Sequence, residues 1–152
     1  MYYIALENIR SLLNIGAIFR TCSFFGIKDV ILVGYTGIDL NGKPHPKITK
    51  SSLGTENDLD ITILKNARKL ISFAKNKNLQ VISVEQHRDS VDLNSWQPPE
   101  NYILVFGNEV DGIDKKILAN SKQIVQIPKK GKHKSLNVTT TVGIVLNHLE
   151  LL

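Results

Sequence analysis

Short apolar runs that stop abruptly at breaker or polar residues constrain the fold of this chain most. The runs span 2–6, 30–33, 81–84, 102–106 and 124–127. Runs of this length, rich in Val, Ile and aromatic residues, are typical of strands that a parallel sheet buries on both faces. A further strand is expected at 59–64. Because ligands bind at the carboxyl ends of such strands, the loops after 102–106 and 124–127 are predicted to form one pocket.

Between the first two runs, apolar residues recur with the spacing of one helix face. They are Ile15, Ile18, Cys22 and Phe25. We expect a helix that is capped by Asn14 and ends at Gly26. Arg20 projects away from this apolar stripe, whereas Cys22 lies on it and is therefore interpreted as a core residue, not a nucleophile.

Further helices are predicted at 66–77, near 114–120, and from a cap at Ser135 or Asn137 to about residue 149. Residues 36–54 are rich in Gly, Pro and Lys and predict a long, mobile loop, and 85–99 predicts a connecting stretch. Strands that alternate with helices indicate an α/β fold with a mainly parallel sheet and helices on both faces.

Length and composition favour one domain over residues 1–152 in a reducing compartment. The single cysteine excludes an intrachain disulfide, and polar residues interrupt the apolar segment that a signal peptide would need. No apolar run reaches the length of a membrane span. We therefore expect a cytoplasmic protein without a membrane partner.

The formal charge of +5 favours a polyanionic partner such as RNA. Two basic runs carry much of it. The first consists of Lys43, His45, Lys47 and Lys50, and the second of Lys129, Lys130, Lys132, His133 and Lys134. A solvated lysine face is the alternative interpretation of the first run. The second lies in the predicted pocket loop, where phosphate contact is favoured.

Several well-known catalytic and binding motifs do not occur. The chain has no G-x-G-x-x-G dinucleotide motif, no Walker A loop and no G-x-S-x-G elbow. The four histidines lack metal-ligand spacing with one another or with Cys22, so no metal site is expected.

Three segments in order resemble the SpoU/TrmH family of RNA 2′-O-ribose methyltransferases, within the SPOUT superfamily. Residues 14–21 resemble the family's N-x-G-x-I-x-R-T motif, residues 106–112 its G-x-E-x-x-G motif, and residues 127–138 its I-P…S-L-N-V motif. Residues 82–86 also resemble the strand end that precedes the second motif. Each motif alone is weak, but together they cover nearly the whole chain.

This resemblance implies a C-terminal deep trefoil knot, S-adenosyl-L-methionine as cofactor and a homodimer. Carried over by position, the cofactor contacts fall largely on backbone groups. They are expected at Val84, Glu85, Gly107, Asn108, Gly112, Ile127, Ser135 and Leu136. Glycine permits the close approach of a ligand, and strand ends leave unpaired N–H and C=O groups.

The resemblance also implies catalytic roles for Arg20, Asn14, Glu109, Ser135 and Asn137. Arg20 matches the arginine that acts on the 2′-hydroxyl proton. A guanidinium is rarely a free base, so a role in holding phosphate and stabilising the developing alkoxide is physically easier. Glu109 is either a structural carboxylate or a catalytic one. Ser135 and Asn137 are helix caps, pocket residues or both.

RNA contacts are expected from Arg20, Lys43, Lys47, Lys129, Lys130, Lys132 and Lys134. Only 13 residues precede Asn14, so no separate RNA-binding domain is expected. Transfer RNA is the preferred substrate because a small dimer can grip a compact molecule, and ribosomal RNA stays an alternative. A base-methylating relative and a basic RNA-binding module without activity are the rival functions.

Overall fold

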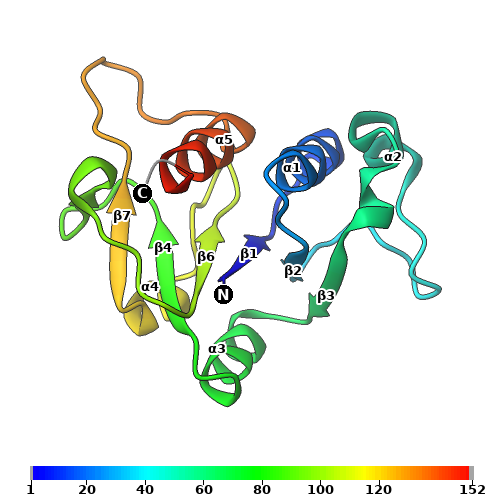
Figure 1. Ribbon diagram of the computed structural model, residues 1–152, viewed down its shortest axis with the longest axis horizontal. Helices are drawn as coiled ribbons and strands as arrows, with labels where there is room; N and C mark the ends of the chain where they lie inside the picture. The colour runs from blue at the N-terminus through cyan, green and yellow to red at the C-terminus, as the bar shows by residue number, and fades with distance from the viewer. Residues whose placement is uncertain (1, 151–152) are drawn as a thin grey trace.

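The computed structural model describes residues 2–150, which form a seven-stranded parallel sheet with helices on both faces (Figure 1). The sheet order is β3-β2-β1-β6-β4-β7-β5, and all its strand pairs are parallel. The strands are β1 Tyr2–Glu7, β2 Asp29–Val33, β3 Asp60–Leu64, β4 Gln80–Val84, β5 Val91–Asp92, β6 Tyr102–Phe106 and β7 Gln123–Gln126. The predicted α/β fold is confirmed.

Five α-helices and two short 3-10 helices connect the strands within residues 2–150. They are α1 Leu12–Phe24, α2 Pro46–Ser52, η1 Thr55–Asp58, α3 Ala67–Asn76, η2 Leu93–Ser95, α4 Lys115–Asn120 and α5 Val138–Leu149. None of them combines the length and the apolar content that a bilayer crossing requires.

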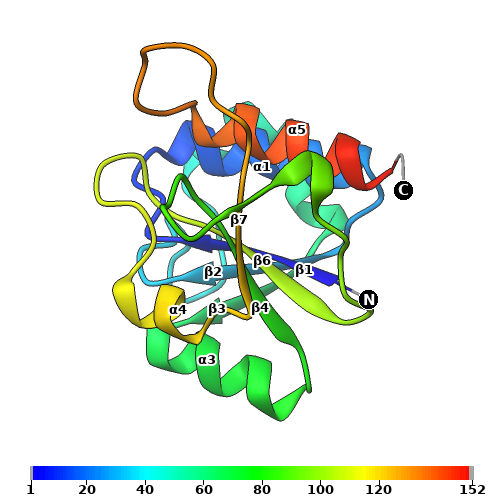
Figure 2. The same ribbon diagram turned by 90° about the vertical axis from the view of Figure 1, so that its left-hand side faces the viewer.

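Two apolar cores lie on opposite faces of the sheet because successive strand residues point to opposite sides. Ile4 and Leu6 of β1 belong to the core between the sheet and helices α1 and α5. Tyr3 and Ala5 belong to the core between the sheet and helices α3 and α4. All five residues of β6 are buried, as expected for a central parallel strand. Figure 2 shows the two helix layers with the sheet between them.

Helix α1 differs from its prediction at its start. Its N-cap is Ser11, whose Oγ accepts the backbone N–H of Asn14 at 3.3 Å, so the prediction of Asn14 as cap is wrong. Ser11 is as good a cap as Asn14, and the earlier start leaves the Asn14 side chain for another contact. Cys22 is a core residue as predicted, and burial raises its pKa to about 12, so it remains a thiol. Phe25 lies one residue beyond the helix and is half-buried.

The expected mobile loop at 36–54 and the connecting stretch at 85–99 both contain structure. Helix α2 forms within the first segment, with His45 as its N-cap and Pro46 at its first position, and buries Ile48 against α1. The second segment adds edge strand β5 and buries Trp96, whose Nε1 donates to Gln123 Oε1 at 3.0 Å. The hydrophobic periodicity of the sequence did not predict the structure in these two segments, because each of them buries only one or two apolar side chains.

Gly16 lets α1 and α2 approach closely. A Cβ at this position would overlap Ser51 Oγ and the carbonyl oxygen of Ile48. The glycine of the first motif therefore has a packing reason in this chain.

We expect Gly16→Ala to lower the free energy of unfolding by about 1–3 kcal/mol, the usual cost of overpacking. Gly143→Ala is the matched control, since a Cβ in helix α5 at that position meets no atom within 4 Å. It should leave stability unchanged or raise it by about 0.5–1 kcal/mol. Urea denaturation of both variants measures the difference, and equal stabilities would contradict this account of Gly16.

Candidate functional site

A cleft of about 670 Å³ lies at the carboxyl ends of β6, β4 and β7, beside the start of α5. We call it the main cleft. These three strands are neighbours in the sheet, so the loops that follow them converge. Every residue predicted to contact a cofactor lines it: Val84, Glu85, Gly107, Asn108, Gly112, Ile127, Ser135 and Leu136. The prediction of one pocket from these loops is confirmed, and its volume suits a small-molecule ligand.

The loop after β6 forms one wall of the main cleft and is tightly folded. Asn108 and Gly112 form an antiparallel bridge, and Asn108 Oδ1 accepts the backbone N–H groups of Val110 at 2.9 Å and Asp111 at 2.8 Å. A Cβ at Gly107 would lie 2.5 Å from the carbonyl carbon of Gly112 and the nitrogen of Ile113. Glycine is therefore required at 107 for this loop to close.

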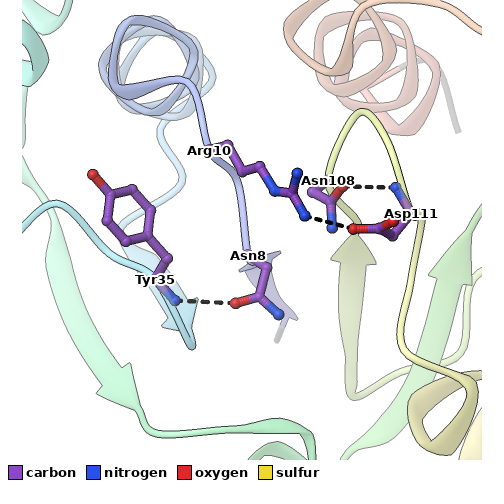
Figure 3. Close-up of a pocket in the computed structure, with 5 residues that line it drawn as sticks. All are labelled: Asn8, Arg10, Tyr35, Asn108 and Asp111. Atoms are coloured by element: carbon purple, nitrogen blue, oxygen red, sulfur yellow. Dashed lines mark hydrogen bonds and ion pairs between the residues drawn. The ribbon is translucent and has the colours of Figure 1, made fainter.

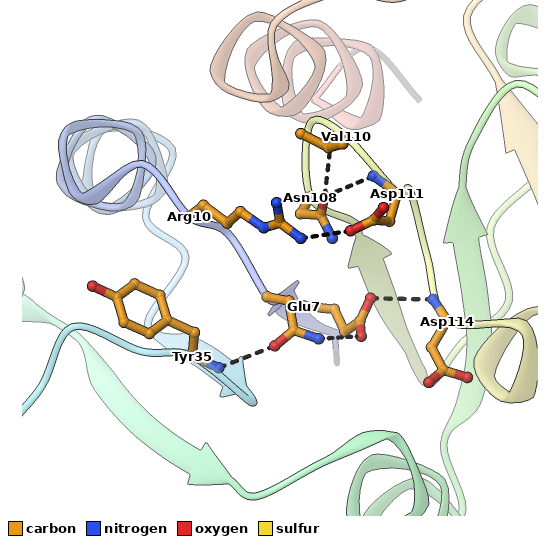
Figure 4. A network of polar contacts seen from close by, with 8 residues as sticks. Glu7, Arg10, Tyr35, Asn108, Val110, Asp111 and Asp114 are labelled. Carbon is orange, nitrogen blue, oxygen red and sulfur yellow. Dashed lines mark hydrogen bonds and ion pairs between the residues drawn. The ribbon is translucent and has the colours of Figure 1, made fainter.

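Two carboxylates hold the far end of the same loop. Glu85 Oε2 accepts the N–H of Ile113 at 2.8 Å. Glu7 Oε2 accepts that of Asp114 at 3.2 Å, as Figure 4 shows. A Cβ at Gly112, where φ is +70°, would overlap the Glu85 carboxylate. Glu85 was predicted as a cofactor contact, and its carboxylate is engaged in supporting the loop.

Glu7, the last residue of β1, was not among the predicted site residues. It is 3% exposed, and burial raises its pKa, partly opposed by hydrogen bonds from Asp114 and Asn8. A carboxylate directly after a buried parallel strand is the signal that could have found it, because the carboxyl edge of the sheet carries the loops.

The first turn of helix α1 and the segment before it are attached to the loop after β6 by two polar contacts. Asn14 Nδ2 donates to Glu109 Oε1 at 2.6 Å. Arg10 Nη2 lies 2.7 Å from Asp111 Oδ2, as Figure 3 shows. The first two motif segments, far apart in the sequence, therefore touch. Glu109 also lines the main cleft, so it has both the structural contact and the position for a direct role.

Some predicted residues lie elsewhere in the described chain. Lys129, Lys130 and Lys134 line the main cleft, but Lys132 does not. Neither do Arg20, Asn14, Asn137, Lys43 or Lys47. Arg20 is exposed on α1.

The cap of helix α5 is also settled. Asn137 is the N-cap, and its Oδ1 accepts the N–H of Thr139 at 2.8 Å, which confirms one of the two predicted caps. Ser135, the other candidate, lies in the loop before the helix and lines the main cleft.

Gln86 is a polar residue of the main cleft that was not predicted as a contact. Its Nε2 donates to the carbonyl oxygen of Ile127 at 2.7 Å, so this carbonyl points where an amide donor can reach it. Within residues 2–150, no group of His, Cys, Asp and Glu side chains could hold a metal ion.

Comparison with known proteins gives consistent results. The model of the SpoU rRNA Methylase family matches residues 1–147. A tRNA (guanosine(18)-2′-O)-methyltransferase of Aquifex aeolicus is 29% identical over 141 residues, which are 92% of this chain and 64% of that enzyme. A 23S rRNA (adenosine(1067)-2′-O)-methyltransferase of Streptomyces azureus is 26% identical over 144 residues, 95% of this chain and 52% of that enzyme.

Solved structures agree in fold. An AdoMet-bound rRNA methyltransferase from Sinorhizobium meliloti superposes with a TM-score of 0.87 at 26% identity, over 99% of this chain and 56% of that one. The chain thus spans less than two thirds of the length of these relatives.

The support that Glu85 gives to the loop can be measured. Glu85→Ala removes the acceptor of the Ile113 N–H, and we expect the free energy of unfolding to fall by about 1–3 kcal/mol. Glu85→Gln keeps an oxygen in the same place and should lose less. Denaturant titrations of the three proteins test this, and an alanine variant as stable as the parent would refute the role.

Proposed function

Because the chain belongs to the SpoU rRNA Methylase family, we propose that it transfers a methyl group from S-adenosyl-L-methionine to a ribose 2′-hydroxyl of RNA. The main cleft carries this proposal, since the second and third motif segments and the strand end after β4 all line it. We prefer tRNA as substrate, with rRNA as the alternative, and relatives that act on each RNA resemble this chain.

The main cleft suits a ligand that is held mostly by backbone groups. Gly107 leaves its side of the cleft bare of a side chain, and Leu136 is half exposed at 53% beside it. The Ile127 carbonyl already accepts an amide N–H from Gln86, which is the chemistry that an adenine amino group would offer. S-adenosylmethionine supplies an electrophilic sulfonium methyl group when it is bound.

Arg20 is proposed to act on the RNA side of the reaction. A guanidinium is a poor proton acceptor. It is suited to hold the adjacent phosphate with two N–H groups and to stabilise the developing alkoxide, while the proton passes to phosphate or water. Asn14 would orient the ribose or Arg20, and Glu109 holds Asn14 at 2.6 Å. Ser135 lines the main cleft, and Asn137 is the N-cap of α5 two residues further on.

A homodimer would explain why Arg20 does not line the main cleft of its own chain. Leu13, Ala17, Arg20 and Phe24 recur at i, i+4, i+7 and i+11 on α1. Leu13 is 49% exposed and Phe24 83%, and Ile144 is 38% exposed on the neighbouring helix α5 (Figure 1). We infer that a second copy of the chain covers this face. Arg20 of the first copy would then lie close to the main cleft of the second.

Other parts of the proposal rest on placement in the fold. The three loops that would form a deep trefoil knot all meet in the main cleft, which supports the knot. Elements across the chain contribute to the two cores, which supports one methyltransferase domain over residues 1–152. The buried thiol of Cys22 suits the reducing cytoplasm.

The predicted RNA-binding lysines are all exposed, as phosphate contacts require. Lys129, Lys130, Lys132 and Lys134 stand in the loop that Figure 2 shows projecting beyond α5. Lys43 and Lys47 are exposed at and before α2. We propose that the first group tracks the phosphates nearest the cofactor and that the second reaches more distant ones.

We expect Arg20→Ala to lower methyl transfer by on the order of 10²–10³-fold, because one transition-state donor is lost. Arg20→Lys should recover part of the activity, since it keeps the charge but not the paired donors. Labelled cofactor and unmodified total RNA provide the assay, and calorimetry with S-adenosylmethionine should show unchanged binding. Near-full activity of the alanine variant would remove Arg20 from the mechanism.

The same assay separates the rival functions. Methylation of the ribose makes the dinucleotide resistant to nuclease, whereas a base-methylating enzyme leaves the linkage cleavable. RNA binding without any transfer would indicate a module that lacks activity.

Subunit mixing tests whether Arg20 acts across the dimer. Arg20→Ala leaves the main cleft intact, and Gly107→Ala disrupts the cleft but keeps Arg20. If the arginine acts on the partner's cleft, mixed dimers carry one complete site, and activity should recover to about a quarter of wild type. Phe24→Asp in both chains is the control, and it should abolish the recovery. No recovery in the mixture would place Arg20 and the cleft in the same chain.

A further inference from the structure

We propose that a second pocket, beside the main cleft, binds an unpaired nucleobase of the RNA. This side pocket has a volume of about 380 Å³ and is lined by Asn8, Arg10, Tyr35, Asn108 and Asp111 (Figure 3). The inference rests on the proposed function in one respect, that RNA is the substrate.

The side pocket lies at the carboxyl edge of the sheet, where β2, β1 and β6 end. Tyr35 follows β2 by two residues, Asn8 directly follows β1, and Asn108 follows β6. Asn108 lines the main cleft as well, so the two sites share a wall. A strand that places its ribose at the main cleft therefore has a neighbouring position for a base.

Tyr35 offers an aromatic surface on an anchored backbone. Its side chain is 50% exposed, and its backbone N–H donates to Asn8 Oδ1 at 3.1 Å. Asn8 is itself held, since its Nδ2 donates to Glu7 Oε1 at 2.8 Å. A Cβ at Gly34 would overlap Asn8 Oδ1, so glycine at that position permits this contact. A half-exposed ring on an anchored backbone is the platform on which unpaired bases stack.

Arg10 and Asp111 give the side pocket a polar edge. Their side chains are 62% and 63% exposed, and the pair is joined at 2.7 Å. Exposed pairs of this kind add little stability, but here the contact orients both groups. Arg10 has further N–H donors, and Asp111 has further acceptor capacity, next to each other. The edges of nucleobases likewise present acceptors beside N–H donors.

The charges indicate that the base enters the side pocket and that the phosphates stay outside. Arg10, the one cation of the lining, is already paired with Asp111, and the Glu7 carboxylate contacts Asn8 behind the lining, so the side pocket has no excess positive charge to attract a phosphate. One cation lies near the rim. Gly34 N–H donates to the Leu64 carbonyl at 2.9 Å, so Lys65, which follows Leu64, emerges next to Tyr35. Lys65 is exposed.

The experiment uses a single-stranded RNA of about ten nucleotides that carries 5-iodouridine and a fluorescent label. Irradiation should crosslink the base to Tyr35, as mapped by mass spectrometry. Tyr35→Ala should weaken binding in an anisotropy titration by roughly 5- to 150-fold, the range for one lost stack. Tyr35→Phe keeps the ring and should bind within about twofold of wild type.

Ile63→Ala is the matched control, because Ile63 is 49% exposed on β3 and does not line the side pocket. It should leave RNA affinity unchanged, and thermal melting should show that all three variants are folded. An alanine variant of Tyr35 with wild-type affinity, no crosslink at Tyr35, or no binding of the RNA by the parent protein would each overturn the proposal.

Failure of the proposed function gives a different result. If the protein does not bind S-adenosylmethionine in calorimetry, yet crosslinks at Tyr35 and depends on its ring, the side pocket stands and the methyltransferase proposal falls. If methyl transfer occurs and Tyr35→Ala has no effect on RNA affinity, the side pocket falls alone.

Discussion

The structure depends on how the loop after β6 satisfies its backbone N–H groups. Glu85 and Glu7 accept the N–H groups of Ile113 and Asp114, and Asn108 accepts two more within the loop. Buried N–H groups without acceptors are costly, so these side chains decide the shape of the loop. Glu7 is the last residue of β1 and Glu85 directly follows β4, the two strands that flank β6 in the sheet. These strands therefore determine the position of the loop.

The same loop links the sites that the function requires. Through Glu109 and Asp111 it contacts the first turn of α1 and Arg10, two residues before that helix, and through Asn108 it forms a wall of both pockets. A ligand in the main cleft and a base in the side pocket would therefore contact one common element. The exposed face of α1, with Arg20 between Leu13 and Phe24, lines neither of the two pockets.

Much of the fold and of the main cleft could be predicted from local patterns. Central strands such as β6 are continuous apolar runs because both of their faces are buried, and the glycine that follows β6 marks where the backbone must close. The predicted start of α1 was wrong because Ser11 and Asn14, three residues apart, are comparable N-cap residues. Helix α2 was missed because its one buried apolar residue, Ile48, packs on α1 and not within a periodic stripe of its own.

By itself the sequence determined the alternation of strands and helices and the loops at the carboxyl edge, because these follow from local spacing and from glycine positions. The residues expected in the main cleft came from the resemblance of its motifs to a known family. Only the tertiary structure decided that Glu7 is a buried support, that Asn14 contacts Glu109, that Tyr35 and Arg10 share a pocket, and that Arg20 lies outside the main cleft. These facts depend on which strand ends are neighbours. Strand order is set by the packing of the whole sheet, and no local pattern contains it.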